Sequence, residues 1–395
     1  MKLRVRSGDS LWYYCQLFLL PLDLVLDSNP DVDPNNLSVG TEISIPGFNT
    51  FGYKITKGDT IWKLAQSYHL NPEAILILNQ TVNLNRLRIG DVINIPFRIT
   101  RPIVNVGLKY DDAVLNKHLC ELQRFYPFIK TRTIGKSVLG KPLQEILIGT
   151  GQKKININAA FHANEWITTP ILMTFLNDYL LALTNTQNLC GIVMNPFYRS
   201  VQLSVVPMVN PDGVSLVLKG PTEEVRDSVV GINNESENFT AWKANIRGVD
   251  LNNQFPAKWE IEKERKEPKG PAPRDYPGDA PLTEPEAIAM ANLVKESRFD
   301  RLIALHTQGE EFYWGYEGFE PEEASIIAKE FARVSGYKEV QYIDSHAGFK
   351  DWFIQEFRKP GFTLELGKGI NPLPLSQFYD IYRKTLPIFI AALYT

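Results

Sequence analysis

The chain has 395 residues, of which 44% are hydrophobic and 22% charged, and its 42 basic and 45 acidic side chains give a net charge of −3. This composition is typical of a globular protein with two or three cores, and it excludes a largely disordered chain. The near balance of charge would attract neither nucleic acid nor an anionic membrane surface, so neither is expected as a partner.

The cysteines and the longest apolar runs exclude further classes. Cys15, Cys120 and Cys190 are odd in number and far apart, which fits neither a disulfide framework nor a thiolate zinc site. The N-terminus, "MKLRVRSGDS", lacks the apolar core of a secretory signal, and "LFLLPLDLVL" is too short to span a bilayer. We therefore expect a chain without a membrane span that is cytoplasmic as synthesised.

An internal repeat occupies the first hundred residues. "VRSGDSLWYYCQLFLLPLDLVLDSNP" recurs as "ITKGDTIWKLAQSYHLNPEAILILNQ", with the matching positions displaced by 50 residues. Each copy predicts a short strand, a Gly-Asp turn, a helix with Ser10 or Thr60 near its start, a second helix set off by Pro21 or Pro72, and a closing strand. The order is therefore β-α-α-β.

This pattern resembles the LysM domain, which binds the N-acetylglucosamine-containing glycans of peptidoglycan or chitin. The resemblance covers residues 1 to about 98 and predicts two domains, 1–48 and 49–98. It implies that sugar contacts come from backbone groups in the loops after the Gly-Asp turn and before the repeated asparagine of each copy. Since buried aromatic and aliphatic side chains usually mark packing, we expect four repeated residues in the cores: Trp12, Trp62, Leu37 and Leu87.

A third domain is predicted over residues 99–395, and its apolar runs lead into polar residues. "KKININAAF" is followed by His162, "VQLSVVPMVN" ends at Asn210, "RLIALH" ends at His306, and "GFTLELG" carries Glu365. Helical stretches lie between these runs, which predicts an α/β/α domain with a mixed, largely parallel sheet. Functional side chains collect beyond the carboxyl ends of such strands, so these four residues are expected to converge.

The polar strand ends contain the components of a hydrolytic metal site. The spacing His162-x-x-Glu165 is weak evidence alone, because it arises often by chance. A hydrolytic zinc ion needs three protein ligands and an open position for water, and His306 supplies the third ligand. Glu365 is a carboxylate in an apolar run, where burial without a function would be costly, and it could accept the proton of that water. One Zn²⁺ is expected.

At these residues the domain resembles the zinc carboxypeptidase family, of the carboxypeptidase A type. The shared motifs, in the family's order, are "IGKSVLGKPL", "HANEW", "VNPDG", "RGVDLNNQFP" and "FTLELG". The resemblance covers residues 105–395 and implies zinc on His162, Glu165 and His306, with Glu365 as general base. In "VNPDG", Asn210 and Asp212 are expected to build a turn rather than to touch substrate. Asp250 is expected to be a buried support.

The chain departs from the family where substrates are held. The family clamps the substrate's terminal carboxylate with an Asn-Arg pair, but here Asn252 is followed by Asn253, and Asn164 stands where digestive members carry another arginine. All three asparagines are candidates for substrate binding. The loss of two cations disfavours ordinary C-terminal trimming of proteins. Arg247 is a candidate to polarise the scissile carbonyl, with a structural role as the alternative.

Two further segments are predicted to border the cleft. In "QYIDSHAGFKDW" the family keeps a mobile tyrosine that closes over substrate, and both Tyr342 and His346 are candidates for that position. The polar insertions 218–239 and 260–279 are predicted to be loops around the cleft that help to select the substrate, or simply solvated surface.

The two halves together predict action on peptidoglycan. Glycan-binding repeats raise the effective concentration of a hydrolase at the polymer. The layout resembles the γ-D-glutamyl-meso-diaminopimelate peptidases of spore-forming bacteria, which implies peptidoglycan glycan and stem peptide as partners and a role in sporulating cells. The alternatives are a zinc carboxypeptidase or amide deacylase acting on other peptides, and a non-catalytic wall-binding protein. The sequence does not predict an oligomeric state or a preference between diaminopimelate and lysine.

Overall fold

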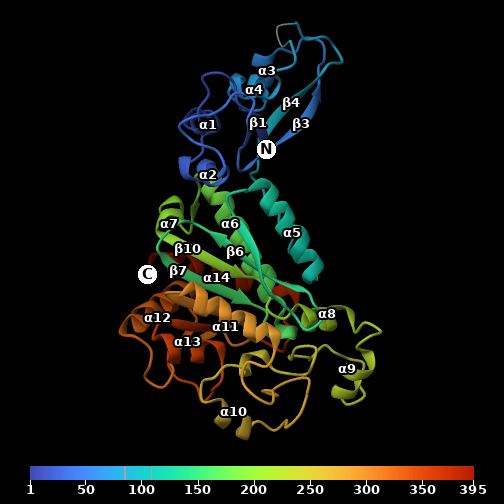
Figure 1. The fold of residues 1–395 in the computed structure, drawn as a ribbon, viewed down its shortest axis with the longest axis vertical. Coiled ribbons are helices and arrows are strands. Elements are labelled where there is room, and N and C mark those ends of the chain that lie inside the picture. The colour runs from blue at the N-terminus through green and yellow to red at the C-terminus, as the bar shows by residue number, and fades with distance from the viewer. Residues whose placement is uncertain (84–85, 108) are drawn as a thin grey trace. The chain divides into compact units, whose positions relative to one another are not determined.

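The computed structural model describes residues 1–83, 86–107 and 109–395, which form two compact units. One unit comprises residues 1–103 together with 118–130 and 177–195, and the other comprises residues 104–117, 131–176 and 196–395 (Figure 1). The first unit contains both repeat modules. The second contains the sheet that carries the predicted metal ligands.

Each repeat folds into the predicted strand, two helices and closing strand, which confirms the β-α-α-β order. Ser10 and Thr60 accept hydrogen bonds from Tyr13 N and Lys63 N, and so cap the first helix of each module. The terminal strands of each module pair antiparallel. The elements are β1 (Lys2–Arg4), α1 (Leu11–Phe18), α2 (Leu22–Asp27) and β2 (Glu42–Ser44), then β3 (Phe48–Lys54), α3 (Ile61–Ser67), α4 (Pro72–Leu78) and β4 (Val92–Arg98).

The repeated asparagines join the second helix of each module to its closing strand. Asn29 donates to Val25 O and Ser44 O and accepts from Ser44 N. In the second module, Asn79 likewise donates to Asn94 O and accepts from Asn94 N. Both side chains are buried. Because a buried amide must be paired, these bonds explain why asparagine recurs at this position.

The repeated tryptophans are not core residues, so the prediction that they are buried is wrong. Trp12 and Trp62 are 64% and 61% exposed. Each is the second residue of its helix, whereas the core face of α1 is formed by Leu11, Tyr14, Cys15 and Phe18. Since successive helical residues point about 100° apart, the tryptophan after the first core residue faces solvent. Leu37 and Leu87 are partly buried and pack against the cores of their modules, as expected.

The second unit is built on an eight-stranded mixed sheet of order β13-β12-β14-β11-β7-β10-β6-β5. The four strands β14, β11, β7 and β10 are parallel neighbours, while β12 and β6 run antiparallel to β14 and β10. The predicted α/β domain with a largely parallel sheet is confirmed. The strands are β5 (Lys130–Lys136), β6 (Pro142–Ile148), β7 (Lys153–Ala159), β10 (Val201–Val206), β11 (Arg301–His306), β12 (Glu311–Tyr313), β13 (Lys338–Val340) and β14 (Gly361–Glu365).

Helices pack on this sheet. Residues of α11 and α13 share a buried core with Leu302 and Ala304 of β11. Helix α14 contacts α12, and its Phe389 packs on Phe175 of α6 with ring centroids 4.7 Å apart. The helices are α5 (Asp112–Phe125), α6 (Thr168–Asn185), α7 (Asn195–Ser200), α8 (Pro211–Lys219), α9 (Arg226–Ile232), α10 (Trp259–Arg265), α11 (Pro285–Ser297), α12 (Glu322–Ser335), α13 (Phe349–Phe357) and α14 (Phe378–Tyr394).

The remaining elements are short, and one long helix is notably apolar. The short elements are the hairpin β8 (Asn188–Leu189) and β9 (Ile192–Val193) and the 3₁₀ turns η2 (Ala163–Glu165), η3 (Leu251–Asn253) and η4 (Leu375–Gln377). Within the described residues, one helical stretch, Ala163–Asn185, is long and apolar enough to cross a membrane. In the most apolar 18-residue segment of this stretch, 89% is buried inside the protein, as in a core helix.

The "NPDG" segment lies at the start of helix α8, so Asn210 and Asp212 have the structural role that was expected, at a helix N-terminus and not in an isolated turn. Asn210 is the N-cap and accepts a hydrogen bond from Gly213 N, and Pro211 occupies the first helical turn. Asparagine at the cap and proline at the next position are both favoured at helix starts. Asn210 also donates to the carbonyl of Phe161, next to His162. The segment therefore supports the metal ligand without touching the pocket.

Helix α11 buries a carboxyl group whose charge should affect stability. Glu286 is fully buried, and its side chain accepts a hydrogen bond from Val138 N. Burial raises the pKa of Glu286 to about 7 from an ordinary value of 4.5, and the nearby carboxylate of Asp212 adds to the rise. The folded protein therefore holds this proton over a pH range in which the unfolded chain has released it.

We expect the free energy of unfolding to fall as the pH rises from about 4.5 to about 7, because the folded state binds more protons there. The pKa rise corresponds to about 3 kcal/mol. Glu286→Gln keeps the acceptor for Val138 N and should flatten this pH dependence in urea unfolding measured from pH 4 to pH 8. The exposed Glu296→Gln on the same helix serves as control. An unchanged pH profile for Glu286→Gln would contradict the assignment.

Candidate metal centre

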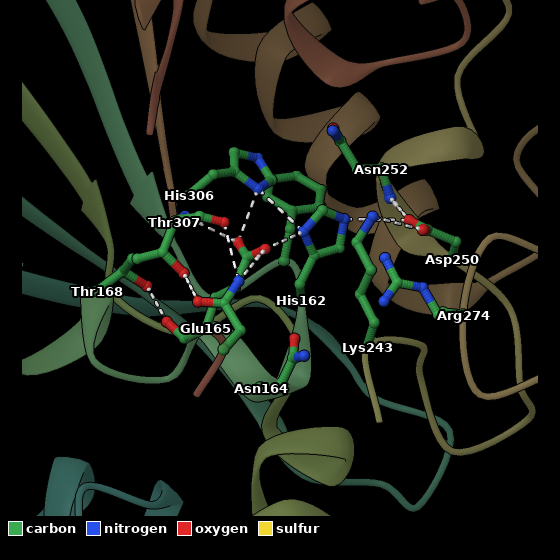
Figure 2. Close-up of polar contacts among 12 residues, drawn as sticks. His162, Asn164, Glu165, Thr168, Lys243, Asp250, Asn252, Arg274, His306 and Thr307 are labelled. Atoms are coloured by element: carbon green, nitrogen blue, oxygen red, sulfur yellow. Dashed lines mark hydrogen bonds and ion pairs between the residues drawn. The ribbon is translucent and has the colours of Figure 1, made fainter. Parts of the chain in front are cut away.

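The carboxyl ends of three neighbouring strands bring the predicted ligands together. Strand β7 ends at Ala159, and the chain then turns through His162 into the 3₁₀ turn that carries Glu165. His306 is the last residue of β11 and is paired in register with Glu365, the last residue of β14. Figure 2 shows the side chains of His162, Glu165 and His306 pointing toward one another.

The three side chains converge on one small volume. Glu165 Oε1 lies 3.0 Å from His162 Nδ1, Glu165 Oε2 lies 3.0 Å from His306 Nδ1, and the two ring nitrogens are 3.1 Å apart. All three residues are buried. A tetrahedral zinc ion with ligands about 2.0 to 2.1 Å away has ligand atoms roughly 3.3 Å from each other. The donor types and their spacing therefore fit a two-histidine, one-carboxylate zinc site.

A shell of buried polar groups orients these ligands. Asp250 is fully buried, and its Oδ1 lies 3.1 Å from His162 Nε2, while Lys243 Nζ lies 3.1 Å from Oδ2 of the same carboxylate. Thr307 N donates to Glu165 Oε2 at 3.2 Å. Partners of this kind fix the ring orientation and tautomer of metal-binding histidines. Asp250 is thus the buried support that the sequence predicted.

The electrostatics of the cluster favour charged carboxylates. Burial alone would raise the pKa of Glu165, but His162 and His306 lower it well below its usual range. Burial opposes the charge of Asp250 as well, yet the ammonium of Lys243 and the ring of His162 lower the pKa of this carboxyl. Burial lowers the pKa of His306. A neutral imidazole and ionised carboxylates are the forms that bind a divalent cation.

A pocket of about 200 Å³ opens over this cluster, and Glu365 lies in its wall with His162 and His306. Burial raises the pKa of Glu365 to about 8, and the carboxylate of Glu165 adds to the rise. A divalent cation bound nearby would act in the opposite direction, because an opposite charge favours the ionised carboxylate. Glu365 is therefore placed next to the three donors as a carboxylate outside the ligand set.

Two of the predicted substrate-binding residues lie in the pocket. Asn252 and Asn253 both line it, on the 3₁₀ turn that follows Asp250. Asn252 Oδ1 accepts a hydrogen bond from Phe349 N. Asn253 is buried, and its Nδ2 lies 3.5 Å from Glu262 Oε1. The pocket therefore presents the amide of Asn253 at the position where the family has an arginine.

The other four predicted residues do not line this pocket, so their roles in catalysis and substrate binding stay predictions. Arg247 is half exposed and its guanidinium pairs with Glu284, 3.6 Å away. Asn164 is buried and donates to Ala241 O. The Tyr342 hydroxyl donates to Glu320 at the surface, and the His346 ring contacts the Tyr316 hydroxyl. In each case a local polar partner holds the side chain.

The sequence reasoning missed the basic residues of the pocket. Lys243, Lys266 and Lys350 all line it, together with Asp351. Lys243 follows the first polar insertion and Lys266 lies in the second, and these insertions contain the helices α9 and α10 as well as loops. A search for lysines near the missing arginine could have found Lys243, seven residues before Asp250. No pattern in the sequence indicated Lys350.

The mixed, largely parallel sheet, the two-histidine, one-carboxylate cluster and Glu365 beside it define a metal-dependent hydrolase. The family model for zinc carboxypeptidases matches residues 115–386, and that for the LysM domain matches residues 3–46 and 53–96. The chain belongs to the zinc carboxypeptidase family and carries two LysM domains. Its cofactor is one zinc ion, for which His162, Glu165 and His306 form the site.

Known proteins resemble the chain over different lengths. It is 59% identical to "Gamma-D-glutamyl-L-diamino acid endopeptidase 1" of Lysinibacillus sphaericus over 396 aligned positions, covering 100% of both chains. It is 51% identical to the Bacillus subtilis protein YqgT over 72% of this chain and 77% of that one. The crystal structure of thrombin activatable fibrinolysis inhibitor matches with a TM-score of 0.59 and 19% identity, over 72% and 73% of the two chains, and supports the fold.

Proposed function

We propose that the chain is a zinc peptidase of peptidoglycan that hydrolyses the bond between γ-D-glutamate and meso-diaminopimelate in stem peptides. The observation that carries the proposal is the 59% identity along the full length to an endopeptidase named for γ-D-glutamyl-L-diamino acid bonds. The pocket agrees with it, since Asn253 replaces the arginine that clamps ordinary C-termini. Trimming of unmodified proteins is therefore not the activity that we expect.

The hydrolysis can be assigned to residues of the pocket. His162, Glu165 and His306 hold the zinc ion, which when bound acidifies a water molecule and polarises the scissile carbonyl. Glu365 accepts the proton of the attacking water and returns it to the departing amine of the diamino acid. This route needs no covalent link between enzyme and substrate. The buried carboxylate of Asp250 keeps the ring of His162 oriented throughout.

Positive charge for the substrate comes from lysines. Lys243 Nζ, held by Asp250, lies in the pocket beside His162 and can stabilise the oxygen of the scissile carbonyl as negative charge develops, the role first considered for Arg247. Lys266 is partly exposed in the same pocket, 3.3 Å from Glu262. With Asn252 and Asn253, it can receive the α-carboxylate of the diamino acid.

The LysM domains give the enzyme its place of action. They supply binding to N-acetylglucosamine-containing glycan, and tethering to that polymer raises the local concentration of stem peptides. The exposed loops after Gly8 and Gly58 offer backbone groups for sugar contacts. We infer that the chain acts on cell-wall material, and in sporulating cells it would reach that material when the mother cell lyses.

A comparison of two substrates tests the proposed function. Purified, zinc-loaded enzyme should release diaminopimelate from L-Ala-γ-D-Glu-meso-diaminopimelate and leave a hippuryl dipeptide with an ordinary free C-terminus essentially intact. Products are separated by liquid chromatography and identified by mass. The reverse pattern would show a conventional carboxypeptidase and overturn the proposal, and inactivity of zinc-loaded enzyme on both substrates would also count against it.

A further inference from the structure

An asparagine in the loop after β14 contacts one of the metal ligands from outside the pocket. Asn371 Nδ2 donates to Thr307 O at 3.0 Å and to Glu165 Oε1 at 3.4 Å. Asn371 Oδ1 accepts from the Thr307 hydroxyl at 2.7 Å. Because a backbone carbonyl can only accept, the amide nitrogen must face Thr307 O. The two bonds with Thr307 therefore fix the orientation of the amide and point its N–H groups toward Glu165.

The buried carboxylate of Glu165 needs donors that remain when the metal is bound. The Nδ1 atoms of His162 and His306 face it, but a nitrogen that binds a metal ion carries no proton and cannot donate. Two other donors reach this carboxylate from the described residues: Thr307 N at Oε2 and Asn371 Nδ2 at Oε1. Each oxygen of Glu165 thus has one donor that is not itself a metal ligand.

The loop that carries Asn371 is also closed by contacts that do not involve the metal centre. Gln377 donates to Lys368 O at 2.8 Å and accepts from Lys368 N at 3.3 Å, which ties the two ends of the loop together. Gln377 makes no hydrogen bond to a metal ligand among the residues that the structure describes. The loop therefore does not depend on the bond between Asn371 and Glu165 for its closure, and that bond calls for another explanation.

We propose that Asn371 is a positioning residue of the zinc site, whose amide is held by Thr307 and in turn orients the carboxylate of Glu165 for the metal ion. A ligand that is already held in place loses little freedom when the ion binds, so the affinity for the ion is higher. The residue does not line the pocket and needs no contact with substrate. The inference therefore concerns the metal site alone and goes beyond the proposed function, whichever peptide is cleaved.

The affinity for zinc tests the proposal on the full-length protein. Asn371→Ala removes the donor to Glu165 Oε1 and keeps all three ligands, so the Kd for zinc should rise by roughly 10- to 100-fold, measured by competition with a chelator. Thr307→Val removes the hydroxyl that orients the amide but keeps the backbone N–H, so it should raise the Kd by less. Gln377→Ala is the matched control, since it removes an amide from the same loop, and it should leave the Kd unchanged.

Bound Co²⁺ gives a second readout that a change in the loop alone would not move. The visible absorption of this ion depends on the geometry of its ligands, so Asn371→Ala should shift the spectrum of the cobalt-loaded protein and Gln377→Ala should not. Asn371→Asp keeps the size of the side chain and the acceptor for the Thr307 hydroxyl, but it has no donor for Glu165. It should shift the spectrum as well, and it serves as the second variant if Asn371→Ala does not fold.

The outcomes separate this inference from the proposed function. An unchanged Kd for zinc in folded Asn371→Ala would overturn the inference, and so would a cobalt spectrum identical to that of the wild type. Equal losses of affinity in Asn371→Ala and Gln377→Ala would overturn it too, because the shape of the loop would then be the cause. Failure of the zinc-loaded wild type to cleave the diaminopimelate peptide would overturn the proposed function and leave this inference standing, since both readouts report on the metal alone.

Discussion

Replacing Glu365 with glutamine should lower kcat by roughly 10²- to 10⁴-fold, the range that a positioned general acid–base group contributes. Glutamine keeps the size of the side chain but cannot take a proton from the attacking water. Glu365 lies at the end of β14 in register with His306, next to the ligand cluster but outside it. The zinc content should therefore stay at one ion per chain, measured by elemental analysis alongside steady-state kinetics.

A neighbouring glutamate provides the matched control. Glu311 faces Glu365 across the antiparallel pair β12–β14, but it does not line the pocket, and its carboxylate is held by the Tyr313 hydroxyl at 2.7 Å. Glu311→Gln removes the same charge from the same part of the sheet and should keep most of the activity. Zinc-loaded Glu365→Gln with a near wild-type kcat would remove this residue from the mechanism.

The ligand cluster could be predicted because it depends on sheet topology. An apolar run followed by a polar residue indicates a buried strand and its carboxyl end, and parallel strands bring such ends to one edge. His162, His306 and Glu365 each carry this signal, and all three meet in the structure. The duplicated modules were equally predictable, since the same turn, cap and asparagine positions recur in both copies.

The substrate pocket could not be predicted in the same way. Lys243 lies in a segment after an insertion, where no periodicity fixes its direction, and it reaches the metal centre through an ion pair with Asp250. Arg247, four residues later, points instead to Glu284. The direction of a long basic side chain depends on which nearby carboxylate it pairs with. The spacing of residues along the sequence does not predict that partner.

The exposed tryptophans illustrate a second limit. Hydrophobicity alone predicts that Trp12 and Trp62 are buried, but helix phase places them on the solvent side, next to a buried first residue in α1. Short helices of seven or eight residues have only two turns, so the phase rests on very few positions. The sequence also could not decide between Tyr342 and His346 as the mobile residue of the family, because both lie in a loop, where no periodicity indicates the direction of a side chain.

Removal of one metal ligand should abolish both zinc binding and turnover. In His306→Ala, two donors remain where three converged within 4.8 Å of one another. Loss of a group that merely orients a ligand weakens metal binding by about 10- to 100-fold, so loss of a ligand should cost more than about 100-fold. Dialysed His306→Ala should therefore contain no zinc by elemental analysis, with no measurable hydrolysis of the diaminopimelate peptide.

Two further variants allow the loss of zinc binding in His306→Ala to be compared with smaller effects. Asp250→Asn alters the support of His162 and should weaken zinc binding by the intermediate 10- to 100-fold, measured by competition with a chelator. His69→Ala changes an exposed histidine in the second LysM domain and should keep one zinc ion per chain. His306→Ala should fold, because the sheet is held by apolar packing on α11 and α13 and not by the metal. Far-ultraviolet circular dichroism checks that it does. If folded His306→Ala retained a full equivalent of zinc, the ion would have to be bound elsewhere, and the assignment of the ligand cluster would be wrong.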